Sequence, residues 1–177
     1  MPIGASTSAP FAFIEFCVRY SVRCRPSSEL QTISVDDNKL SELTLVQRLV
    51  NRSITPRPDP PGTDLSWMEN AKVGDCDDYA MTKRGRLLDS GWPASAVLLA
   101  IAVVPNGEHH IVVVVVTESG DLVLDNLRPN VIQWTKLPYR WIKRSSPYDP
   151  REWQVIAKHP TDKRSDEIAM LERCKSR

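Results

Sequence analysis

Apolar and polar residues follow helical spacing in the first half of the chain and give way to strand-like runs in the second. Apolar residues three or four positions apart predict a helix over residues 36–50, capped by Asp36 or Asp37. An inward apolar stripe predicts a second helix over residues 76–90, which ends before Gly91. We therefore expect the main helices of the fold to come early in the chain.

The second half of the chain is rich in β-branched residues, which favour strands. Residues 96–104 and 110–117 predict two buried strands joined by a turn at residues 105–108. Further strands are predicted between turn-forming residues at 122–125, 131–135, 139–143 and 153–157. We expect an antiparallel meander. Helices followed by a sheet indicate an α+β fold rather than a parallel α/β fold.

The length of 177 residues suits one domain, so we expect residues 1–177 to form a single unit. Small residues, Pro and Ser at the start predict a flexible lead-in over residues 1–12. Four prolines between residues 54 and 64 predict an extended surface loop before the second helix. Residues 160–177 are charged with a few apolar positions, and they predict a C-terminal helical tail.

The charge balance and the short apolar runs exclude two classes of partner. Basic and acidic residues number 23 and 22, so no strong charge field exists to bind nucleic acid. The apolar runs are far shorter than the ~20 residues of a membrane-spanning helix, so we expect a soluble protein without membrane insertion. The N-terminus lacks a basic segment followed by an apolar one. Either the protein is cytosolic or this chain begins after a signal peptide.

Four cysteines are present, and no pair has the CxxC spacing of a zinc or redox site. Cys17 and Cys24 can close a short disulfide loop in an oxidising compartment or stay as thiols in a reducing one. Cys76 differs because it stands at the start of a predicted helix. Unpaired backbone N–H groups and the helix dipole favour the thiolate there, so Cys76 is the candidate nucleophile.

Three carboxylates flank this cysteine, those of Asp75, Asp77 and Asp78. Negative neighbours disfavour a thiolate, so the motif contains an electrostatic conflict. Two interpretations remain open. In the first, the acids bind a hard cation, for which Asp59 and Asp64 of the proline-rich loop, and Asn51 just before it, offer further oxygens. In the second, the acids only complement the dipole of the first helical turn.

An acyl-transfer enzyme needs an imidazole, and an acid or amide to orient it, beside its thiolate. His109 and His110 lie at the start of a predicted strand. Only one of them can face Cys76, because successive strand residues point to opposite faces. Asp125 ends the neighbouring strand, where its carboxylate can lie beside that histidine. The sequence thus offers a thiol, an imidazole and a carboxylate.

The order of helix cysteine, strand histidine and strand aspartate resembles the transglutaminase-like branch of the papain-like superfamily. Several stretches are similar to the bacterial transglutaminase-like cysteine proteinase family, which includes the LapG-type periplasmic proteases: Phe16-Cys17, Cys24, Gly74–Ala80, Lys83-Arg84, His110–Val112, Thr117, Gly120–Leu127, Trp141, Arg144–Ser146, Asp149-Pro150 and Trp153. The resemblance covers most of the chain. It implies a papain-like or transglutaminase-like fold in which the nucleophile helix packs on an antiparallel sheet.

The resemblance implies a role for each candidate residue. Cys76 is the nucleophile, His110 is the general base and Asp125 orients the imidazole. His110 is preferred to His109 because it directly precedes the Ile-Val-Val run, as in the family pattern. The backbone N–H of Cys76 is the expected oxyanion donor, and Trp67 is an alternative contributor near it.

LapG-type proteins bind calcium through acids beside the cysteine, so the resemblance implies a Ca2+ site at Asp75, Asp77 and Asp78. Two features depart from the family pattern: Asp77 stands where Glu is more usual, and the proline-rich tract differs. The resemblance also implies a periplasmic peptidase that acts on an adhesin-like surface protein, with a membrane-anchored regulatory protein as a partner. A periplasmic location implies an encoded signal peptide and a Cys17–Cys24 disulfide.

Two alternative functions are compatible with the same residues. The triad can transfer the acyl group to an amine or hydrolyse a side-chain amide, as transglutaminases and amidases do. A non-catalytic binding module can keep the fold and the metal site without any chemistry. Incorporation of a labelled amine separates the first alternative from peptide hydrolysis. Reactivity of Cys76 toward iodoacetamide at neutral pH argues against the second.

Overall fold

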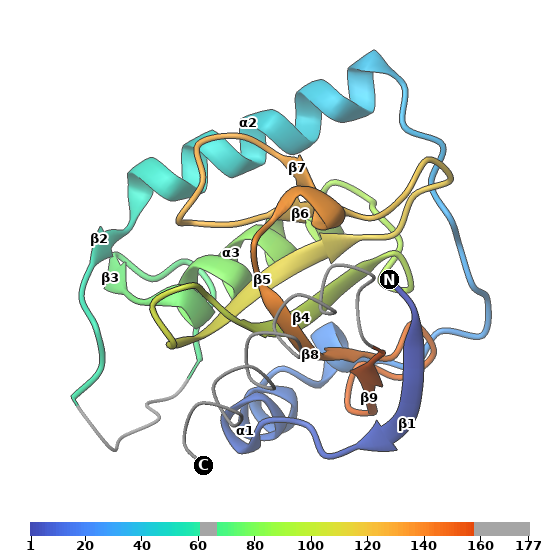
Figure 1. Ribbon diagram of the computed structural model, residues 1–177, viewed down its shortest axis with the longest axis horizontal. Helices are drawn as coiled ribbons and strands as arrows, with labels where there is room; N and C mark the ends of the chain where they lie inside the picture. The colour runs from blue at the N-terminus through green and yellow to red at the C-terminus, as the bar shows by residue number, and fades with distance from the viewer. Residues whose placement is uncertain (61–66, 158–177) are drawn as a thin grey trace, which may run out of the picture.

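The computed structural model describes residues 1–60 and 67–157. Seven strands form one antiparallel sheet in the order β1-β9-β8-β4-β5-β6-β7 (Figure 1). Their bounds are β1 Ile3–Thr7, β4 Val97–Val103, β5 His109–Val115, β6 Leu122–Leu124, β7 Ile132–Gln133, β8 Arg140–Ser145 and β9 Trp153–Ile156. A separate parallel pair joins β2 (Thr55–Pro56) to β3 (Val73–Gly74).

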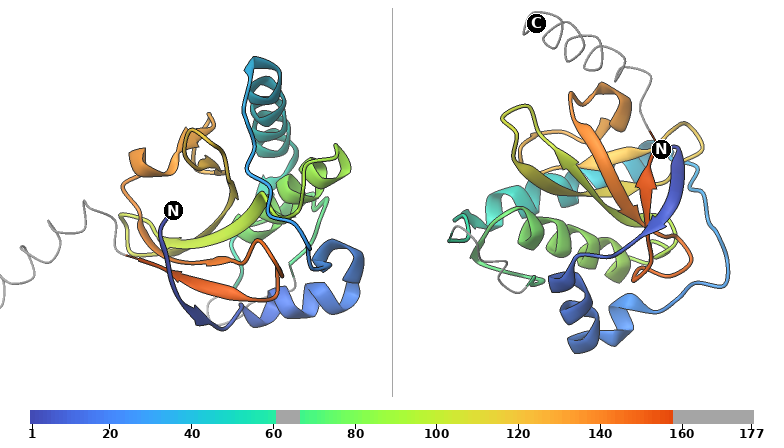
Figure 2. Two further views of the ribbon diagram at one scale, coloured as in Figure 1. Left: turned by 90° about the vertical axis from the view of Figure 1, so that its right-hand side faces the viewer. Right: turned by 60° about the horizontal axis from the view of Figure 1, so that its bottom comes forward.

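Three α-helices accompany the sheet: α1 Phe11–Arg19, α2 Asp37–Ser53 and α3 Cys76–Asp89. Two 3-10 turns, η1 Ser21–Cys24 and η2 Trp134–Lys136, complete the described elements. Helix α3 packs on β5 and β4, and α2 packs on α3 (Figures 1 and 2). The predicted α+β fold, with the cysteine helix on an antiparallel sheet, is confirmed. None of the described helices has the length and apolar composition needed to cross a membrane.

Both faces of the central strands are buried, which explains the nearly unbroken run of β-branched residues in β5. Along β4 and β5, residues such as Leu99 and Val113 face the core on the α3 side. Their neighbours Leu98 and Val114 face a second core, whose aromatic residues are Trp134, Tyr139 and Trp141. The sheet therefore separates two cores, and His109 at the start of β5 lies beside Val103 at the end of β4.

The start of the chain differs from the prediction of a flexible lead-in over residues 1–12, which is wrong. Strand β1 pairs with β9 at the edge of the sheet, and its side chains are largely exposed, so no apolar alternation announces it. Helix α1 follows and buries Phe13, whose ring contacts that of Trp153 at a centroid distance of 6.0 Å. The predicted tail at 160–177 lies outside the described residues.

Cys17 and Cys24 form a disulfide, as predicted. Beside it, the Arg23 side chain donates to Asp89 of α3 at 2.6 Å, while Arg84 of α3 donates to the Arg23 carbonyl at 3.0 Å. These contacts attach the segment that follows α1 to the cysteine helix.

Candidate active site

Cys76 is the first residue of α3, as the sequence predicted, and Asp75 is the N-cap. Asp78, in the first turn, accepts hydrogen bonds from the backbone N–H of Asp75 and, at 3.1 Å, from that of Met68. This backward contact from the third helical residue is one half of a capping box. A Cβ atom at Gly74 would collide with the Asp78 carboxylate, so only glycine leaves room for it. Asp78 therefore shapes the loop that presents the cysteine.

The environment of the Cys76 sulfur opposes its ionisation in the absence of a cation. Burial, assisted by the nearby carboxylates of Asp75 and Asp77, raises the pKa of Cys76 to about 12. The backbone N–H groups of Ile111 and of Cys76 itself act in the opposite direction. The conflict expected from the sequence is thus present in the structure.

His110 and Asp125 form a short hydrogen bond, 2.7 Å from Nε2 to Oδ1. Asp125 Oδ1 also accepts the backbone N–H of Leu127 at 2.9 Å, and Oδ2 accepts the Tyr139 hydroxyl at 2.6 Å. Burial favours the neutral acid, but these hydrogen bonds and His110 hold the pKa of Asp125 below its usual value. The carboxylate is therefore ionised and fixed in orientation.

The same hydrogen bond decides which ring nitrogen can take part in proton transfer. Because Nε2 of His110 donates to an ionised Asp125, Nδ1 is the nitrogen left to accept a proton. His110 is buried whereas His109 is exposed, yet both line a cavity of about 730 Å³ together with Cys76. Within the described structure no hydrogen bond joins the Cys76 sulfur to His110. In enzymes such contacts often tighten only with bound substrate.

Asp75 and Asp77 lie together beside the sulfur. One carboxylate oxygen from each, with the Cys76 sulfur, falls within 4.8 Å of one another. Burial and a hydrogen bond to Asp75 raise the pKa of Asp77 to about 9, and Asp75 Oδ1 is buried without a partner among the described residues. Asp78, the third predicted ligand, is not part of this cluster. Asp59 contacts the Asp75–Asp77 cluster through its backbone, because the Asp59 N–H donates to Asp75 Oδ2 at 3.4 Å.

Two residues of α2 hold the turn that follows Asp125. The sequence suggested Asn51 only as an oxygen ligand for a cation and did not suggest Gln47 as a site residue. The Gln47 side-chain nitrogen donates to the carbonyls of Asp125 and Arg128, both at 2.6 Å. Asn51 donates to the same two carbonyls at 3.3 and 3.0 Å. Tyr139, which directly precedes β8, was also not predicted from the sequence as a site residue. The histidine and its acid are thus positioned by three separate parts of the chain.

A family model for bacterial transglutaminase-like cysteine proteinases matches residues 3–161 of the sequence. The chain belongs to this family. No curated protein sequence matches it. Three solved structures of Legionella pneumophila LapG share the fold at 23% identity over 59% of this chain: the calcium-bound form (TM-score 0.54), LapG (0.53) and the EGTA-treated form (0.53). The alignments cover 63%, 62% and 61% of those chains, so this chain spans about three fifths of their length.

Several residues that resemble the transglutaminase-like proteinase pattern support the fold rather than the cavity. The Ser145 hydroxyl accepts the N–H of Leu99 at 3.0 Å, and the Ser146 hydroxyl accepts that of Tyr148 at 3.2 Å. Trp153 is fully buried beneath α1. These contacts join β8 to β4 and pack α1 against β9.

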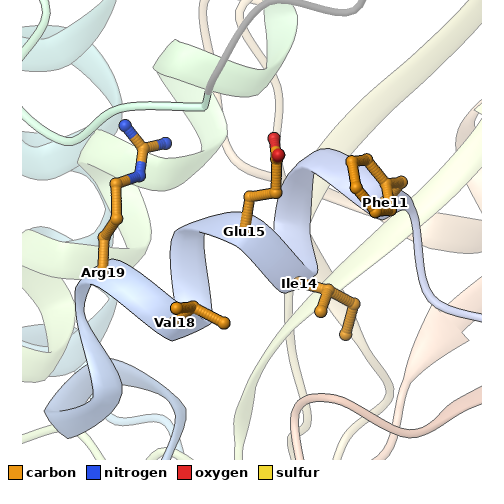
Figure 3. Close-up of a pocket in the computed structure, with 5 residues that line it drawn as sticks. All are labelled: Phe11, Ile14, Glu15, Val18 and Arg19. Carbon is orange, nitrogen blue, oxygen red and sulfur yellow. The ribbon is translucent and has the colours of Figure 1, made fainter.

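A second hollow lies on the outer face of α1, away from Cys76. Figure 3 shows its side chains projecting from one helix: Phe11, Ile14, Glu15, Val18 and Arg19. It contains no thiol or imidazole. It is therefore not a candidate for acyl-transfer chemistry.

Proposed function

We propose that this chain is a thiol-dependent peptidase in which Cys76, His110 and Asp125 act as the catalytic triad. One observation supports this most directly: the buried His110 is tied through Nε2 to Asp125 and lines the same cavity as Cys76. Membership of a cysteine proteinase family supports the reaction class.

In the proposed reaction, Cys76 Sγ attacks the scissile carbonyl carbon while its proton moves to Nδ1 of His110. The backbone N–H of Cys76 stabilises the oxyanion. His110 then donates this proton to the leaving amine, and an acyl-enzyme remains. Water, deprotonated by Nδ1, attacks the thioester and releases the acid and the thiol. Asp125 holds the Nε2–H tautomer and stabilises the imidazolium.

The test compares the wild type with Cys76→Ala and His110→Gln on fragments of candidate adhesin-like surface proteins, with a labelled amine present. The expected result is a pair of cleaved peptides from the wild type and none from either variant. Amine incorporation at glutamine without cleavage would indicate a transglutaminase instead. If Cys76→Ala cleaved at the wild-type rate, the proposed nucleophile would be wrong.

We also propose that Asp75 and Asp77 hold Ca2+. The residues fit this ion because one oxygen of each carboxylate lies in the same small cluster, and Asp75 Oδ1 is buried without a partner among the described residues. A bound cation would counter the negative charge beside Cys76 and favour its thiolate. One of the similar LapG structures is calcium-bound.

The calcium proposal is tested by following alkylation of Cys76 with iodoacetamide at pH 7, in Ca2+ and in EGTA. We expect Ca2+ to raise the alkylation rate at least tenfold in the wild type, because it lowers the pKa of the thiol by about one unit or more. The increase should disappear in Asp77→Asn. Equal rates with and without Ca2+ would argue against a cation at this position.

The substrate and location form a further part of the proposal, supported by the family resemblance. The substrate is an adhesin-like surface protein, the location is periplasmic, and a membrane-anchored regulatory protein is the partner. Fractionation of cells that express the tagged native gene tests the location. Recovery in the cytosol with the Cys17–Cys24 pair reduced would contradict it.

A further inference from the structure

Lys83 is a buried cation that the proposed mechanism does not use. It lies seven residues after Cys76, about two helical turns along α3, and only 1% of its surface is exposed. Within the described part of the chain, its Nζ atom has no hydrogen-bond partner. A buried ammonium is strongly unfavourable unless other groups compensate its charge.

Two groups near the Lys83 ammonium can provide that compensation. Nζ lies 6.0 Å from the centre of the Tyr79 ring, within cation–π range. The carboxylate of Asp125 acts on it electrostatically: burial lowers the pKa of Lys83 to about 7, and Asp125 opposes that shift. The acid of the proposed triad is thus the charge partner of a lysine on the nucleophile helix.

Helix α2, which packs on α3, contributes acceptors that match this donor. Gln47 Oε1 and Asn51 Oδ1 are buried and have no partner among the described residues. The nitrogen atoms of the same two amides hold the Asp125 carbonyl. An unpaired donor on α3 and two unpaired acceptors on α2 are therefore buried on two packed helices. They make no direct hydrogen bond to one another in the described structure, so water is the group that can bridge them.

We propose that Lys83 is a positioning residue of the triad: its ammonium group is a buried counter-charge of Asp125 and, together with the hydrogen bonds from Tyr139 and Leu127, helps to keep that carboxylate directed at His110. The inference rests on the proposed triad. Arg128 also acts on Asp125, but its guanidinium is open to solvent, where its charge is screened. Lys83 is the cation that acts from the protein interior.

The test measures the pKa of the His110 imidazole by NMR in the Cys76→Ala background, so that neither turnover nor the thiolate enters. Lys83→Met removes the charge and keeps much of the volume, Lys83→Arg keeps the charge, and Lys136→Met is the control at an exposed lysine. We expect about a tenfold rise in the proton affinity of His110 for Lys83→Met, because a nearby positive charge is lost. Lys83→Arg and Lys136→Met should stay within about twofold of the parent.

Thermal unfolding separates a functional lysine from a structural one. A buried charge replaced by a well-packed apolar side chain often leaves stability equal or higher, so we expect Lys83→Met to melt at or above the parent temperature. If it does not fold, Lys83→Gln, uncharged but polar, gives the same comparison. An unchanged His110 titration in the uncharged variant would overturn the inference, with or without a fall in melting temperature. This outcome is independent of the proposed peptidase activity, which the Cys76→Ala cleavage experiment tests separately.

Discussion

The Tyr139 hydroxyl is the group whose removal tests the arrangement around Asp125 most cleanly. It donates to Asp125 Oδ2 at 2.6 Å and accepts from Arg128 Nε at 3.4 Å. Tyr139→Phe deletes this one oxygen and keeps the ring, which packs against His110 and Trp141 at centroid distances of 6.2 and 5.8 Å. The perturbation is therefore confined to the charge-assisted hydrogen bond to Asp125 and the longer one from Arg128.

The magnitude follows from leaving a buried carboxylate oxygen without its donor. Loss of one hydrogen bond to a charged group costs about 1.5–3 kcal/mol of unfolding free energy. The hydrogen bond helps to keep the pKa of Asp125 below its usual value, so its contribution is present above the unfolded pKa of ~4. It is lost as the pH falls through the lower folded pKa. The pKa of Tyr139 itself is raised to about 12, chiefly by burial, so the donor stays protonated at neutral pH.

Urea unfolding of the wild type and Tyr139→Phe at pH 7 and at pH 3 measures this prediction. The difference should be about 1.5–3 kcal/mol at pH 7 and smaller at pH 3. Tyr148→Phe is the matched control, because Tyr148 is 54% exposed, and it should change stability by less than about 0.5 kcal/mol. A Tyr139→Phe loss no larger than the control, or one that is the same at both pH values, would refute the reasoning.

Two further predictions concern stability. Replacing Cys17 and Cys24 by Ser should lower the unfolding free energy by about 2–3 kcal/mol, because the disulfide closes a loop with a sequence separation of 7; no change in the urea midpoint would contradict this. Gly85→Ala should destabilise α3 although alanine ordinarily favours a helix by ~1 kcal/mol, because its Cβ would lie 2.7 Å from the Glu69 carboxylate. A higher melting temperature for Gly85→Ala would show that Glu69 can move aside.

Local rules account for the parts of the fold that the sequence predicted. The start of α3 at Cys76 and its end near Gly91 depend on capping residues within a few positions, and β4 and β5 depend on apolar runs. Helix α1 was missed because its evidence is non-local: Phe13 is buried against Trp67 and Trp153, both distant in the sequence. Strand β1 pairs through its backbone, which leaves no side-chain pattern.

The site shows the same division between local and distant information. Sequence spacing and family resemblance nominated His110 and Asp125, and the structure places them in a hydrogen bond. Gln47 and Tyr139 come from elements far from both, and a buried glutamine or tyrosine carries no local signal of its partner. The folded structure identifies such residues through their hydrogen bonds to Asp125.

The acids beside Cys76 illustrate why equal residue types in one motif need not share a role. Asp78 is engaged by backbone N–H groups and by the space at Gly74, so its charge is used to build the helix start. Asp75 and Asp77 instead lie side by side next to the sulfur, where the repulsion of their negative charge for a thiolate adds to burial in raising the pKa of Cys76. On the calcium proposal, an ion that relieves this repulsion also favours the thiolate. By linkage, thiolate formation then tightens ion binding by the same factor.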